Sequence, residues 1–168
     1  MSLVAPLQTA CLIVFALLLM WAAWQDLRTL RIADAVSLGV VAAFAVWALG
    51  GAILGTVSPS MIGFALACAV GMFGLGAVGF ALGVLGGGDV KLLAAVSLFA
   101  GPVLLPDFLT VTALTGGALG LAVLAGAPIG PAAPAGQATV RVRLRRGLPY
   151  GPAIAAGGLW VAGSLALR

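Results

Sequence analysis

The chain has no histidine and no glutamate, and its acidic residues are the aspartates Asp26, Asp34, Asp89 and Asp107. The lack of histidine excludes Ser-His and Cys-His catalysis and histidine-ligated metals. The two cysteines, Cys11 and Cys68, lie in separate apolar segments and form no Cys-x-x-Cys pair. We therefore expect small buried side chains there, with no zinc site and no disulfide.

Charge of either sign is scarce. Charged residues make up 7% of the 168 residues and hydrophobic residues 63%, with a mean hydropathy of +1.26, whereas about a quarter of a soluble domain is charged. No polar stretch approaches the size of a domain. The composition predicts an all-α polytopic membrane protein in which residues 1–168 form one membrane-embedded domain.

A spanning helix needs about twenty apolar residues, and six segments meet or approach that length. The first has no basic residues before it and is too long for the apolar region of a signal peptide, so we interpret it as a transmembrane helix. We expect six transmembrane helices, at about Leu3–Trp24, Ala35–Leu54, Met61–Leu85, Val90–Leu105, Phe108–Ala127 and Tyr150–Leu167.

The basic residues are distributed unevenly between the connections. The first, third and fifth connections carry seven of the eight, including Arg28, Arg31, Lys91 and the cluster Arg141–Arg146. The positive-inside rule places these connections in the cytoplasm and both termini outside. Asp26 and Asp89 should then lie at a similar depth on the cytoplasmic side, with Asp107 on the opposite side.

The segment Gly86-Gly87-Gly88-Asp89-Val90-Lys91 places a carboxyl group beside apolar helices. A carboxylate next to hydrocarbon is costly, so it suggests a function. Two aspartates at one depth suggest the chemistry in which two carboxyl groups share a proton, one activating water and the other polarising a carbonyl. Asp26 and Asp89 are therefore the candidate catalytic residues, with the separation of their carboxyl groups left open.

Structural alternatives exist for the charged residues. Asp89 could cap a helix, Asp26 could be an interfacial charge beside Trp21 and Trp24, and Lys91 could extend to the interface as a topology anchor.

The other charged residues have mainly structural interpretations. Asp34 could be a helix cap, a partner of Arg31 or part of the rim of the site, and Asp107 an extracytoplasmic cap. We interpret the arginines as topology determinants, with a short strand possible at 141–146.

Three motifs resemble those of the type IV prepilin peptidase family, in the same order along the chain. Gly86-Gly87-Gly88-Asp89 fits the Gly-x-Gly-Asp motif of intramembrane aspartyl proteases, and Val90-Lys91-Leu92 extends the similarity. The segment Asp26–Ile32 resembles the family's catalytic aspartate and the basic stretch after it, although Ala33-Asp34 replaces Pro-Asn. Leu148–Ala153 resembles the proline-glycine start of the family's last helix.

This resemblance implies an aspartic endopeptidase that cleaves the basic leader from prepilins or pseudopilins, in a bacterial inner membrane and on its cytoplasmic side. It implies catalysis by Asp26 and Asp89, with supporting positions at Gly86, Gly88 and Lys91, and no metal or other cofactor. The chain is similar to the short form associated with Flp-type (tight-adherence) pili, which lacks the methylase extension. The expected partners are the substrate and the bilayer, with no nucleic acid; the oligomeric state is open.

Two other classes of function are also consistent with the sequence. One is a small transporter or channel that uses Asp89 and Lys91 in a proton or ion pathway, because polar residues in membranes also mark such routes. The other is a non-catalytic pilus assembly factor that binds pilins.

Overall fold

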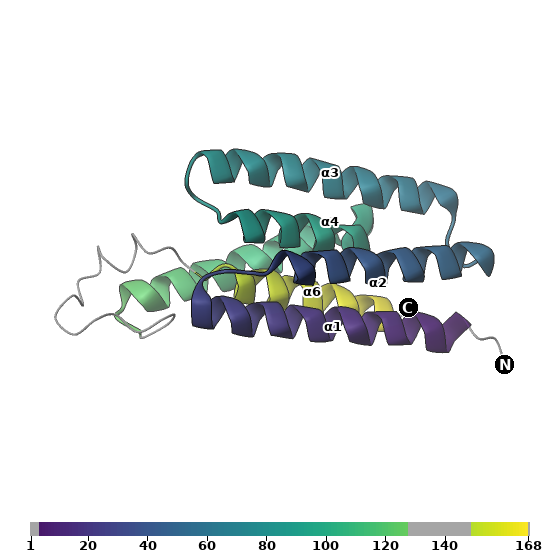
Figure 1. Ribbon diagram of the computed structural model, residues 1–168, viewed down its shortest axis with the longest axis horizontal. Coiled ribbons are helices and arrows are strands. Elements are labelled where there is room, and N and C mark those ends of the chain that lie inside the picture. Colours follow the sequence, from purple (N-terminus) through teal and green to yellow (C-terminus); the bar gives the residue numbers. More distant parts are fainter. Residues whose placement is uncertain (1–3, 128–148, 168) are drawn as a thin grey trace.

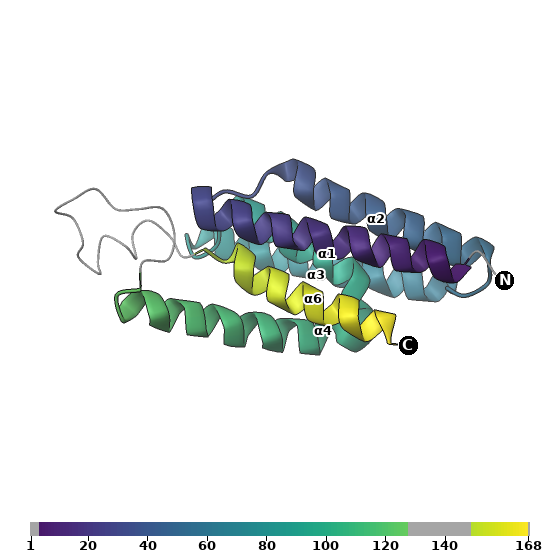
Figure 2. The same ribbon diagram turned by 90° about the horizontal axis from the view of Figure 1, so that it is seen from below.

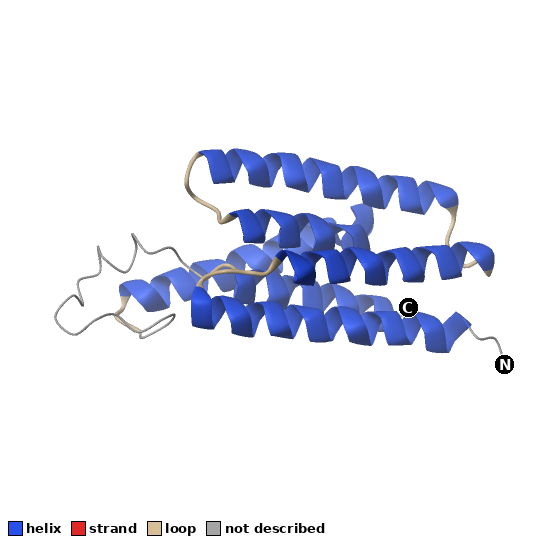
Figure 3. Ribbon diagram, in the orientation of Figure 1, coloured by secondary structure: helices blue, strands red, loops and turns tan. Residues whose placement is uncertain are grey.

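A computed structural model describes residues 4–127 and 149–167, and these form five helices with no strand (Figure 3). Their bounds are α1 Val4–Thr29, α2 Asp34–Ile53, α3 Pro59–Ala81, α4 Gly87–Leu124 and α6 Gly151–Ala166. The first four are long and apolar enough to cross a membrane, and α6 is a shorter apolar helix. The prediction of an all-helical membrane protein is confirmed in this form.

The helices form a bundle whose long axes run in roughly the same direction (Figure 1). The helix α4 packs against α2, α3 and α6, and α1 packs against α2 and α6. Phe99 lies at the centre, with its ring stacked on Phe15 at 4.2 Å and edge-on to Phe44 at 5.4 Å between centroids. The outer helix α3 buries few residues, so most of its surface is left for lipid.

The prediction of six separate helices is wrong, because the described residues form five helices and the fourth and fifth predicted segments are joined in α4. The helix nevertheless breaks at Gly101, where φ is 53° and ψ is −171°, a conformation that favours glycine. Its two halves run in opposite directions (Figures 1 and 2).

The turn was predicted around Pro106 and Asp107, which instead lie inside the helix. Gly101 supplies the reversal, and Pro102 suits the first turn of a new helix because the amide hydrogen it lacks has no helical acceptor there. The half before the break, residues 87–100, rises only about 20 Å.

The bundle has two distinct ends. The end of α1 and the beginnings of α2, the first half of α4 and α6 lie at one end, whereas the start of α1 and the end of α6 lie at the other (Figure 1). Three of the four aspartates are at the first end, and Asp107 follows the reversal near the second. The relative depths predicted for the aspartates agree with this arrangement.

Candidate active site

Asp26 lies in the last turn of α1, which continues to Thr29 rather than ending at Trp24 as predicted. Its side chain is 4% exposed, whereas Trp21 and Trp24 are about half exposed. The carboxylate therefore points into the bundle, which argues against the interfacial alternative. Its Oδ2 accepts a hydrogen bond of 2.7 Å from the backbone N–H of Gly151, at the start of α6.

Gly151 fits against this carboxylate only because it has no side chain. A Cβ at this position would lie 2.7 Å from Asp26 Cβ and 2.9 Å from its Oδ2, closer than real Cβ atoms come to their neighbours. The first turn of α6 therefore both donates to Asp26 and fixes its place. The sequence indicated a proline-glycine helix start here but gave no sign of this contact.

Asp89 lies in the first turn of α4 and is 9% exposed. The N-cap is Gly86 rather than Asp89, and the Gly86 N–H donates to Asp89 Oδ2 at 3.1 Å. The carboxylate thus satisfies a free backbone donor from the third helical position, as in a capping box. Its other oxygen, Oδ1, is buried and has no hydrogen-bond partner among the described residues.

The two aspartates line the same pocket, of about 210 Å³. Its wall consists of the end of α1, the segment after it and the glycines before α4: Asp26, Leu30, Arg31, Ile32, Gly86, Gly87, Gly88 and Asp89. A Cβ at Gly88 would lie 3.0 Å from the Ile32 carbonyl oxygen, so glycine there lets the two connections pass closely. The structure thus brings together Asp26, Asp89, Gly86 and Gly88.

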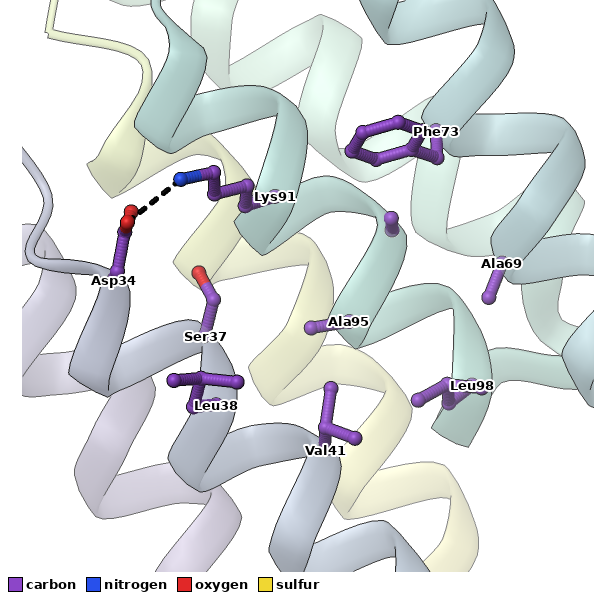
Figure 4. A pocket seen from close by; sticks show the side chains of 10 residues that line it. Asp34, Ser37, Leu38, Val41, Ala69, Phe73, Lys91, Ala95 and Leu98 are labelled. Atoms are coloured by element: carbon purple, nitrogen blue, oxygen red, sulfur yellow. Dashed lines mark hydrogen bonds and ion pairs between the residues drawn. The ribbon is translucent and has the colours of Figure 1, made fainter.

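Lys91 lies outside this pocket. Its Nζ forms an ion pair with Asp34 Oδ2 at 2.7 Å, with the two side chains 47% and 64% exposed. The pair is at one end of a second groove, between α2, α3 and α4 (Figure 4). Asp34 is the first residue of α2, after the N-cap Ala33; its partner is Lys91 rather than Arg31. Arg31 instead lines the pocket of the aspartates.

The segment between α1 and α2 is held by a side chain that sequence reasoning missed. The Ala33 N–H donates to Gln25 Oε1 at 3.2 Å. Leu30 has a φ of 52°, a rare value for a residue with a side chain. This backbone conformation turns the chain away from the end of α1 at the pocket, which Leu30 itself lines.

Several other predictions concern residues away from the pocket. Arg28 lies 4.9 Å from the centre of the Trp24 ring, a cation–π contact that suits an interfacial position. Cys11 and Cys68 are free thiols. Within residues 4–127 and 149–167, no three His, Cys, Asp or Glu residues are grouped to hold a metal. The basic cluster 141–146 and the strand considered there lie outside the described residues.

The fold and the pocket define an apolar helical bundle with two buried aspartates from distant parts of the chain at one end. A family model described as the type IV leader peptidase family matches residues 13–121. The chain belongs to this family, which indicates a peptidase in a membrane setting. Neither the curated proteins nor the solved structures yielded a match. The matched region contains both aspartates of the pocket but ends before α6, so the contact of Gly151 with Asp26 is known from the structure alone.

Proposed function

We propose that this protein is an aspartic endopeptidase that removes the basic leader from prepilins or pseudopilins at the cytoplasmic boundary of a bacterial inner membrane. The observation that carries the proposal is that Asp26 and Asp89 line one pocket in a chain of a leader peptidase family. Both are buried; Asp26 accepts a hydrogen bond from the backbone of α6, and Asp89 accepts one from the N-cap of its own helix. The family also favours peptide cleavage over ion transport.

The proposed reaction uses one proton shared by the two carboxyl groups. One carboxylate takes a proton from water as the oxygen attacks the scissile carbonyl carbon, and the protonated partner donates a hydrogen bond to the carbonyl oxygen. The tetrahedral intermediate then collapses, the C–N bond breaks, and a proton passes to the leaving nitrogen. The two groups titrate as a unit, so the roles of base and acid belong to the pair.

The position of the pocket suits a scissile peptide bond that lies just outside the hydrocarbon of the membrane. The pocket is formed by a helix end and two short connections, where backbone outside helices is tolerated because it lines a cavity. The basic leader would remain in the cytoplasm and the apolar part of the substrate in the membrane.

The orientation in the membrane can be tested by labelling. A cysteine replacing the exposed Ile53, at the other end of the bundle, should react with an impermeant reagent from outside. Reaction of a cysteine at the exposed Val84 from that side would contradict this orientation.

Cleavage of a cognate prepilin by the purified protein in proteoliposomes tests the proposal. Asp26→Asn and Asp89→Asn should each lower kcat by about 10³-fold. Each amide oxygen can still accept from the backbone N–H, so folding should persist. The matched control is Asp107→Asn, at an exposed aspartate near the opposite end, which should cleave normally. Full activity in either variant of the pair would disprove the dyad, and an inactive wild-type protein would favour an assembly factor.

A further inference from the structure

A third cavity opens beside Asp89, between the two halves of α4 and the start of α6. It has a volume of about 560 Å³, within the range of sites that bind ligands. Its walls consist mainly of apolar or small residues, including Leu93, Leu109, Ala113, Gly116, Gly117 and Ile154. We call this cavity the α4 groove.

One wall of the groove is a helix face almost without side chains. Ala113, Gly116, Gly117 and Gly120 follow each other at helical spacing on the second half of α4. A Cβ at Gly117 would meet no atom of the described residues within 4 Å. Gly157 differs, because a Cβ there would press against Phe108 and Thr112. Gly157 thus serves internal packing, whereas no described residue covers Gly117, where a second helix could approach closely.

Asp89 connects the groove with the candidate active site, because it lines both cavities. It is more than nine-tenths buried, and its Oδ1 has no hydrogen-bond partner among the described residues. A buried carboxylate oxygen without a partner is costly unless something binds it. An occupant of the groove would therefore lie directly beside a group that still has an interaction to make.

The direction of the groove also restricts its occupant. Its inner end is formed by Leu93, Leu109 and Ile154, and its outer end by Tyr150 and Gly120. An apolar helix along the inner part would have its backbone bonds satisfied internally, as hydrocarbon requires. The chain leaving that helix outward would pass Asp89 at the level where the helices end.

We propose that the α4 groove binds the apolar transmembrane helix of the substrate against the small-residue face of α4 and thereby positions the scissile bond at Asp89. This inference rests on the proposed function for the identity of the substrate. It assigns Gly117 to substrate binding and not to the chemical step.

Disulfide cross-linking tests binding without requiring cleavage. Gly117→Cys in the Asp26→Asn protein is mixed with prepilins that carry single cysteines along two turns of the apolar segment, and then oxidised. We expect cross-links above the background of a protein with only Cys11 and Cys68. The comparison is Val41→Cys, which lines the other groove, in Figure 4. Cross-links mainly from Val41, or none from position 117 along the whole series, would overturn the proposal.

A groove-filling variant provides the second measurement. Gly117→Leu should raise KM for prepilin by about tenfold with kcat nearly unchanged. The matched control is Gly71→Leu on α3, where a Cβ also meets nothing within 4 Å of the described residues and KM should be unaltered. An unchanged KM for Gly117→Leu would mean that the groove holds something else, such as a lipid acyl chain. If the Gly117→Cys protein cross-links to the substrate but the wild-type protein cleaves nothing, substrate binding in the α4 groove is supported and the proposed function fails.

Discussion

Asp89 and Lys91 are two residues apart at the start of α4, yet they belong to very different regions. Asp89 is buried beside Asp26 in a small pocket, and one of its oxygens lacks a partner among the described residues. Lys91 is about half exposed and forms an ion pair with Asp34 at the groove of Figure 4. An exposed ion pair can be lost at little cost, whereas buried carboxyl groups are retained at a cost that needs a reason. The difference supports the proposal that Asp89, and not Lys91, takes part in the chemistry.

The sharpest test of the comparison is whether the two buried aspartates act as one unit. If Asp26→Asn and Asp89→Asn each lower kcat by about 10³-fold, the double variant should be hardly less active than either single one, because groups acting together do not contribute additively. Single-turnover cleavage of prepilin measures this. Losses that multiply in the double variant would show that the two aspartates have independent roles.

Gly151→Ala should produce the next largest effect. The new methyl group would displace the Asp26 carboxylate and strain its hydrogen bond from the backbone of residue 151. A displacement of about 1 Å can reduce catalysis about a hundredfold, and overpacking costs about 1–3 kcal/mol. The readouts are kcat and the unfolding temperature in detergent.

The control for this substitution is Gly163→Ala in the same helix. A Cβ at that position meets nothing within 4 Å of the described residues, so activity and stability should be kept. Equal behaviour of the two variants would show that the contact of α6 with Asp26 does not matter for the site.

The sequence predicted much of this site because its signals are local. Asp89 follows three glycines, and Asp26 follows the first apolar segment. The distribution of basic residues between the connections was enough to place both aspartates at a similar depth. The contacts of Gly151 with Asp26 and of Gln25 with Ala33 could not be predicted, since they depend on how helix ends meet. The turn at Gly101 was missed because Pro106 and Asp107 are the stronger sequence signal, although only Pro102 lies in the first turn after the break, where proline is tolerated.

Substitutions in the ion pair of Lys91 and Asp34 should have only weak effects on stability and cleavage. Lys91→Gln and Asp34→Asn each remove an ion pair between exposed side chains, which is worth about 0–1 kcal/mol. Thermal unfolding of the single and double variants measures the coupling, and cleavage should be nearly unchanged. The family resemblance gives Lys91 a supporting role, and a large loss of kcat in Lys91→Gln but not in Asp34→Asn would favour that role over the contacts described here.

The smallest effect is expected at Ala33, in the segment that joins the two regions. Its φ of −67° is the value that proline imposes. Ala33→Pro would lose the hydrogen bond to Gln25, worth about 0.5–1.5 kcal/mol, but gain about 0.4–1 kcal/mol from a stiffer unfolded chain. The net change in unfolding free energy should be close to zero. In a Gln25→Ala background that hydrogen bond is already absent, so Ala33→Pro should be plainly stabilising there. Destabilisation in that background, or loss of prepilin cleavage, would show that this connection needs more from residue 33 than its backbone angle.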